Sequence, residues 1–89
     1  MQAKPQLEWR QQALDDLAEM VGFIADDNPD AAQELKDEIE AKAAKLPDHP
    51  KLYKSSSRVK GMREMVVRKN YIVLYRVTPE LVEVVNVLH

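Results

Sequence analysis

The chain of 89 residues carries a net charge of −2 and contains no cysteine and only two histidines, His49 and His89. This composition excludes a disulfide framework and a thiolate site, and it gives no reason to expect a metal or another cofactor. A chain of this length makes one domain with a thin core, predicted over residues 1–89, and without an apolar membrane span or signal-peptide core we expect a cytoplasmic protein without membrane contact.

Residues 4–9 are predicted to form a short strand, with Leu7 and Trp9 on one face. Pro5 lacks the N–H that an interior strand needs, which favours a place at the edge of a sheet. A helix follows over residues 10–26, because apolar residues recur at the i, i+3, i+4, i+7 spacing of one helical stripe. The stripe comprises Ala13, Leu14, Leu17, Ala18, Val21, Ile24 and Ala25.

A second helix is predicted over residues 29–46. Asn28 can cap it through its side chain, Pro29 suits the first helical position, and Asp30 places negative charge where the helix dipole favours it. Its apolar residues form a narrow stripe of Ala32, Leu35, Ile39, Ala43 and Leu46. Two helices with so short a joint form an antiparallel hairpin, whose stripes need an apolar surface to cover.

Residues 47–60 are predicted to be a polar loop, longer than most connections in compact domains. Ser55, Ser56 and Ser57 indicate a flexible linker rather than a nucleophile, because no glycine-flanked strand-turn-helix surrounds them. Long loops on small domains often carry function.

The rest of the chain is predicted to form three strands, over residues 62–68, 71–77 and 81–88, because β-branched and aromatic residues dominate it. Lys69-Asn70 suits a two-residue hairpin turn, and Pro79 suits the second break. An antiparallel meander therefore follows the helical hairpin, which gives an α+β fold in the order β-α-α-β-β-β.

The net charge is unevenly distributed. Residues 1–48 contain five Lys and Arg against twelve Asp and Glu, whereas residues 49–89 contain eight against three. The basic half indicates either a solvated sheet edge protected against pairing or a surface for an acidic protein or nucleic acid. The candidate partner-binding residues are Lys51, Lys54, Arg58, Lys60, Arg63, Arg68 and Lys69.

Few residues indicate catalysis. The two glycines exclude a glycine-rich phosphate loop, and the acidic residues have the spacing of solvated helix faces. Metal-free RNA cleavage could in principle use a general base, cations on the phosphate and an aromatic ring under a base. Tyr71 and Tyr75, however, are expected in the core with their hydroxyls at its rim, and His89, the last residue, is expected to fray.

The string RVKGMREMVVRKNYIVLYRV from Arg58, followed by VEVVNVLH, resembles the C-terminal half of RelE/ParE superfamily toxins from bacterial type II toxin-antitoxin systems. Upstream features agree with this resemblance, namely Asp16-Leu17, Asn28-Pro29 with Ala31-Ala32, Leu46-Pro47 and His49-Pro50. The resemblance implies a helical hairpin packed on an antiparallel sheet. It also implies a growth-arresting toxin of the kind used in plasmid stabilisation, which a cognate antitoxin neutralises and which reaches operator DNA only through that antitoxin.

The superfamily has two activities on one fold. RelE-like members are ribosome-dependent mRNA endoribonucleases, whereas ParE-like members inhibit DNA gyrase and are not enzymes acting on RNA. If this chain were a ribonuclease, the resemblance would assign the catalysis to Arg58, Arg63 and His89, but Met65 and Ile72 stand where further cations are expected. The pI of about 5.6 is also low for a protein that enters the ribosome. The resemblance therefore favours a gyrase inhibitor.

A third hypothesis concerns the end of the chain. Relatives usually continue past the matching histidine with a short tail that often begins Ala-Arg, and this sequence stops at His89. Because that tail contributes to activity in several branches of the superfamily, the resemblance also allows a truncated, non-toxic core that still binds antitoxin.

Overall fold

The computed structural model describes residues 4–89, and residues 1–3 of the predicted domain lie outside the described residues. The elements follow the predicted order β-α-α-β-β-β, with one additional turn of 3₁₀ helix. Their bounds are β1 (Gln6–Trp9), α1 (Gln11–Ala25), α2 (Pro29–Ala44), the 3₁₀ turn η1 (Leu46–Asp48), β2 (Arg63–Val67), β3 (Tyr71–Val77) and β4 (Leu81–Leu88). No helix within residues 4–89 is long and apolar enough to cross a membrane.

The four strands form one sheet in the order β1-β4-β3-β2. The predicted meander is confirmed, because β3 pairs antiparallel with both β2 and β4. The expectation of a wholly antiparallel sheet is wrong, since β1 pairs parallel with β4 and places Gln6 opposite Leu81. Along the chain, β1 is separated from its neighbour β4 by both helices and by β2 and β3, so no hairpin turn fixes its direction and the sequence left this pairing undetermined.

Local chemistry explains where several elements begin and end. The Asn28 side-chain oxygen accepts a hydrogen bond from the Ala31 N–H at 3.1 Å, and Pro29 is the first residue of α2, so the predicted cap is confirmed. The turn between β2 and β3 contains three residues rather than two, and its positive φ angles fall at Arg68 and Lys69 rather than at Asn70. The strand predicted over residues 62–68 is therefore one residue shorter at each end, because β2 runs from Arg63 to Val67.

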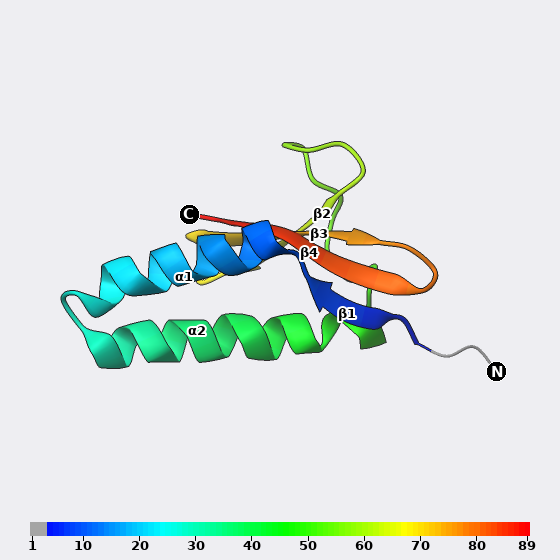
Figure 1. Cartoon of the computed structure of the whole chain (residues 1–89). Coiled ribbons are helices and arrows are strands. Elements are labelled where there is room, and N and C mark those ends of the chain that lie inside the picture. Colours follow the sequence, from blue (N-terminus) through cyan, green and yellow to red (C-terminus); the bar gives the residue numbers. More distant parts are fainter. Residues whose placement is uncertain (1–3) are drawn as a thin grey trace.

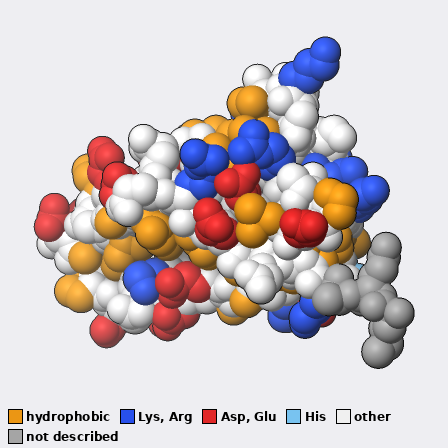
Figure 2. All heavy atoms as spheres, turned by 45° about the vertical axis from the view of Figure 1, so that its right-hand side comes forward, with side chains coloured by type: hydrophobic (Ala, Val, Ile, Leu, Met, Phe, Trp, Pro, Cys, Tyr) orange, Lys and Arg blue, Asp and Glu red, His pale blue; other side chains and the backbone are white. Residues whose placement is uncertain are grey.

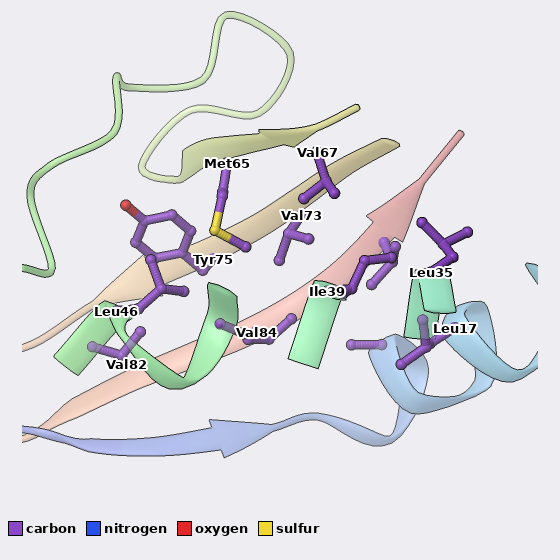
Figure 3. Close-up of a cluster of buried hydrophobic side chains, with 13 residues drawn as sticks. Leu17, Leu35, Ile39, Leu46, Met65, Val67, Val73, Tyr75, Val82 and Val84 are labelled. Carbon is purple, nitrogen blue, oxygen red and sulfur yellow. The ribbon is translucent and has the colours of Figure 1, made fainter. Parts of the chain in front are cut away.

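The two helices cover one face of the sheet, and the loop before β2 projects from the other face (Figure 1). Side chains from the sheet and from the helical layer point toward one another in the core (Figure 3). The largest fully buried residues are Tyr75, Leu35, Ile39, Leu46, Met65, Val67, Val73, Val82 and Val84. Leu14 was predicted to lie on the buried stripe of the first helix, but its side chain is 44% exposed because α2 and the sheet cover only part of that stripe.

A β-bulge lies in the last strand. Leu74 pairs with Asn86 while the next residue, Tyr75, pairs with Val84, so β4 contains one extra residue. The bulge shifts the alternation of β4, which allows Val84 and Val87 to be buried together although they are three residues apart. The Val87 N–H and the Asn86 amide beside this bulge both donate to the Asp16 carboxylate of α1, at 3.0 and 3.1 Å. The first helix is thereby fixed to the C-terminal end of the sheet.

Candidate partner-binding site

Residues 49–62 form a projecting segment that we call the basic loop. Its ends pair like a hairpin, since the Glu64 N–H donates to the Lys54 carbonyl at 3.0 Å and the Ser56 N–H donates to the Met62 carbonyl at 2.7 Å. Gly61, at a φ of 85°, turns the chain back toward β2. The basic loop is therefore an ordered extension of the sheet edge.

Ser56 organises the tip of the basic loop. Its hydroxyl oxygen accepts the N–H groups of Arg58 and Val59 at 3.0 and 3.1 Å, and the hydroxyl donates to the Glu64 carboxylate at 2.6 Å. The predicted flexible linker did not include this network, which holds the loop at Ser56. The sequence could not show this network, because the register between the loop and β2 brings Ser56 and Glu64 together.

The three arginines of the predicted site are engaged within the chain. Arg58 pairs with the buried Glu64 at 3.3 Å, and Arg63 donates to the Tyr53 carbonyl at 2.7 Å. Arg68 donates to Glu38 of α2 at 2.7 Å, and this hydrogen bond lowers the pKa of the Glu38 carboxyl. All three guanidinium groups therefore stabilise the fold, whatever further contacts they make.

The four lysines of the predicted site are exposed and make no ion pair within residues 4–89. Lys51, Lys54 and Lys60 lie on the basic loop, whereas Lys69 lies in the turn between β2 and β3. Figure 2 shows basic side chains on the loop side of the molecule, and acidic side chains both at the helical end and among the basic ones in the middle of this face. The charges of the two halves of the sequence are therefore only partly separated in space.

The three residues considered for ribonuclease chemistry do not converge. Arg58 and His89 line one hollow of about 400 Å³ together with Lys69, Asn70, Ile72 and Leu88. Arg63 alternates along β2 with the buried Met65 and Val67, so it lies on the helical face of the sheet. Ile72, which lines the hollow, lies on the opposite face, since its neighbours Tyr71 and Val73 face the core. Arg63 is therefore separated from the hollow by the sheet.

Met65 and Ile72, the two positions where cations were expected, also lie on opposite faces. Met65 is fully buried in the core and Ile72 is partly exposed on the outer face. A cation at residue 65 would be buried in that core rather than reach a ligand. Only Ile72 occupies a place where a charged side chain could contribute to the hollow.

His89 stacks on Tyr71, with ring centroids 4.9 Å apart and planes inclined by 15°. His89 is exposed and follows the end of β4, and its expected fraying stays a prediction. The two rings also form one end of a second cavity of about 450 Å³ between α1 and the sheet, which we call the α1 groove. It is lined by Asp16, Glu19, Met20, Phe23, Ile24, Tyr71, Val87, Leu88 and His89.

Phe23 is the residue of the α1 groove that the sequence reading missed. Its side chain is 78% exposed, the highest value among the exposed large apolar residues. The available signal was its position, because Phe23 stands outside the predicted apolar stripe of the first helix although it is large and apolar. Phe23 adjoins Met20, Ile24 and Leu88 in the α1 groove, and a contiguous apolar patch of this kind, unlike a single exposed residue, is typical of a surface that another molecule covers.

Within residues 4–89, no three His, Asp or Glu side chains gather in an arrangement that could hold a metal ion. Burial raises the pKa of the Tyr75 phenol. Its hydroxyl donates a hydrogen bond to the Pro50 carbonyl at 3.1 Å. This phenol remains protonated at neutral pH and supports the start of the basic loop. It therefore has a structural role.

Comparisons with known proteins identify the family and the fold. The family model described as "ParE toxin of type II toxin-antitoxin system, parDE" matches residues 7–89. The chain is similar to a solved structure described as "Chromosomal ParDE TA system from P. aeruginosa", with 17% sequence identity, a TM-score of 0.86, and coverage of 97% of this chain and 96% of that chain. At this identity the likeness shows the fold alone. No curated protein matches the sequence.

Proposed function

Because the chain belongs to the ParE toxin family of type II toxin-antitoxin systems, which implies a cognate antitoxin as its partner, we propose that it arrests growth by inhibiting DNA gyrase. It acts in the cytoplasm on its target through binding alone, without a cofactor. The antitoxin neutralises it and supplies the only contact with operator DNA.

One observation supports this activity over RNA cleavage, namely the separation of Arg63 from Arg58 and His89 by the sheet. Phosphoryl transfer needs several donors aimed at the point where charge develops. Arg58 is also partly neutralised by its pairing with Glu64. An mRNA phosphate in the outer hollow would meet at most part of the required charge, whereas a binding inhibitor requires no such convergence.

The target-binding surface in this proposal consists of the seven predicted residues, Lys51, Lys54, Arg58, Lys60, Arg63, Arg68 and Lys69. In this proposal the two kinds of residue have different roles. The exposed lysines contact the target, and the arginines hold the basic loop and the β2–β3 turn in place, a role supported by their bonds to Glu64, the Tyr53 carbonyl and Glu38.

We assign the α1 groove to the antitoxin. Phe23 projects beside an apolar floor that includes Met20, Ile24 and Leu88, and the acidic residues Asp16 and Glu19 stand at its margin. This chemistry suits an antitoxin segment that carries apolar anchors flanked by Lys or Arg and that orders on binding. The helical side of the toxin is acidic and would repel DNA, which agrees with contact to the operator through the antitoxin alone.

Expression of this chain without antitoxin tests the proposal when plasmid supercoiling and mRNA integrity are followed in the same culture. Relaxed plasmid with intact mRNA is the expected result, and purified protein should inhibit supercoiling by purified gyrase. Cut mRNA with normal supercoiling would overturn the proposal in favour of the ribonuclease. If neither changes although the chain binds its antitoxin, the chain is a non-toxic antitoxin-binding core.

A further inference from the structure

Hydrogen bonds within residues 54–64, the tip of the basic loop and the start of β2, hold this segment in a defined conformation, and we call it the finger. Two backbone hydrogen bonds join its ends at Lys54 and Ser56 to Glu64 and Met62. At the tip, the Ser56 hydroxyl binds two successive N–H groups, and the Met62 N–H donates to the Val59 carbonyl at 3.3 Å. A loop ordered by its own bonds loses little conformational entropy when it binds a partner.

This finger presents apolar side chains that the core does not use. Val59 at the tip is 38% exposed, and Leu52 at the base is 67% exposed. Both backbone polar groups of Val59 are bonded inside the loop, so the tip is held with this side chain at the surface. Each exposed apolar residue has a lysine next to it, Lys60 beside Val59 and Lys51 beside Leu52.

The charges around these apolar groups have one sign. Residues 49–63 contain no Asp or Glu. Arg58 is paired with Glu64, and Arg63 with the Tyr53 carbonyl, which leaves Lys51, Lys54 and Lys60 without an ion pair within the described part of the chain. A partner that matches the finger therefore has an acidic surface with an apolar depression at its centre.

The same features favour a protein surface over nucleic acid. The loop aromatic, Tyr53, packs edge-to-face against Tyr75 with centroids 6.5 Å apart, so it does not offer a free ring for base stacking. The phosphate backbone would engage the lysines and leave the apolar groups without a partner.

We propose that the hydrogen-bonded tip of the basic loop is a preorganised finger that inserts Val59, flanked by Lys54 and Lys60, into an acidic, apolar-centred surface of the protein target. Lys51 and Leu52 precede this tip, with Leu52 beside the end of α2, and contact the same surface at the base of the finger. This inference rests on the proposed function, in which that target is gyrase, and it identifies the protein subunits rather than the bound DNA as the contact. Ser56 positions the finger and does not itself touch the target.

The test measures binding to the purified gyrase holoenzyme and, separately, to duplex DNA at physiological salt. Val59→Ser and Leu52→Ser should each weaken binding to gyrase about tenfold, as expected for anchor residues of an interface. Val66→Ser, at another exposed valine on β2, and Lys36→Gln, on α2, are matched controls and should bind like the wild type. Lys60→Glu tests the tip independently and should weaken binding more at low salt than at high salt.

A second variant tests the positioning role of Ser56. Ser56→Ala removes three hydrogen bonds from the loop, and we expect about fivefold weaker binding to gyrase because the free loop is then less ordered. Ser56→Thr retains the hydroxyl and should restore binding. Circular dichroism melting of each variant establishes that the fold is intact before binding is compared.

The outcomes separate the inference from the proposed function. If the wild type inhibits gyrase and the finger variants bind gyrase as tightly as the wild type does, insertion of the finger into the target is refuted and gyrase inhibition stands. If the wild type does not bind gyrase at all, both fail. If Lys60→Glu weakens binding but Val59→Ser and Leu52→Ser do not, and duplex DNA alone is bound with the same affinity as gyrase, the partner of the loop is nucleic acid and the inference is wrong.

Discussion

Replacement of Asp16 by alanine tests the connection between the first helix and the C-terminal end of the sheet. The Asp16 carboxylate accepts the Val87 N–H at 3.0 Å and the Asn86 amide at 3.1 Å, both from β4. Without it, a backbone N–H at the edge of β4 loses its acceptor beside the bulge. We therefore expect a loss of stability and a looser C-terminal strand, including the stacked His89.

The magnitude follows from these two hydrogen bonds. A hydrogen bond to a charged group contributes roughly 1.5–3 kcal/mol when it is shielded from water. The carboxylate is partly solvated, so we halve this value for each bond and expect Asp16→Ala to cost about 2 kcal/mol. A domain of this size loses about 4–8 °C in Tm per kcal/mol, which gives a decrease of about 8–16 °C. Both hydrogen bonds end on the same oxygen, Oδ2, so the amide oxygen of Asp16→Asn can accept both. This change removes only the charge and should cost about half as much, because a charge-assisted hydrogen bond is roughly twice as strong as a neutral one.

The loss of stability caused by Asp16→Ala should become smaller at acid pH. Burial raises the pKa of Asp16, but the hydrogen bonds from Val87, Gln12 and Asn86 together outweigh burial, so the pKa of the folded carboxyl is lowered. A carboxyl with a lowered folded pKa contributes stability that is complete above its unfolded pKa of about 4 and is lost as the pH falls through the folded pKa. The difference between the wild type and Asp16→Ala should therefore narrow below about pH 4.

The assay is thermal and urea denaturation at neutral and acid pH, with Asp15→Ala as the control. Asp15 accepts a hydrogen bond only from Gln11, on the exposed side of the same helix, and its loss should change stability by about 0.5 kcal/mol or less. If Asp16→Ala melts at the same temperature as Asp15→Ala, the connection to β4 does not stabilise the fold. A difference that stays constant down to pH 2.5 would refute the role of the charge.

Three further changes test single contacts. Tyr75→Phe removes the donor to the Pro50 carbonyl and should cost about 1 kcal/mol in urea denaturation; equal stability would show that this hydrogen bond is not formed in solution. Asn28→Ala should cost about 1 kcal/mol through loss of the α2 cap, whereas Asn28→Asp should remain close to the wild type. Phe23→Ser should leave Tm unchanged and weaken antitoxin binding about tenfold in calorimetry, with Leu14→Ser as a control on the same helix; unchanged affinity would remove the α1 groove from the antitoxin interface.

The elements that the sequence predicted best depend on neighbouring residues. Asn28 and Pro29 define the start of α2 by local hydrogen bonding and a fixed φ, and β-branched runs define β3 and β4. Pro79 separates those two strands for an equally local reason. Such features need no knowledge of the rest of the fold.

The bulge and the sheet edges could not be predicted in this way. A bulge between Val84 and Asn86 exists because β3 must pair on both sides of it, and this depends on residues far away in the sequence. The parallel pairing of β1 and the pairing of Ser55 with Arg63 are likewise set by the tertiary structure. The hydrogen bonds that Asp16 accepts from Asn86 and Val87 depend on the bulge. The sequence therefore did not distinguish Asp16 from the exposed carboxylates of the helices.

The basic residues show a physical limit of counting charges along a sequence. A guanidinium is planar and offers five N–H donors, so it readily bonds a carboxylate or a carbonyl of its own chain, as Arg58, Arg63 and Arg68 do here. A lysine ammonium is compact and strongly hydrated, and its side chain keeps the charge in water. Seven equivalent charges in the sequence thus become three arginines that bond groups of the chain itself, although the side chains of Arg58 and Arg68 stay 55% and 43% exposed, and four lysines without an ion pair within the described residues. Since an intermolecular contact is made most readily by charges that have no partner within the chain, the target-binding surface should follow the lysines and the apolar residues beside them.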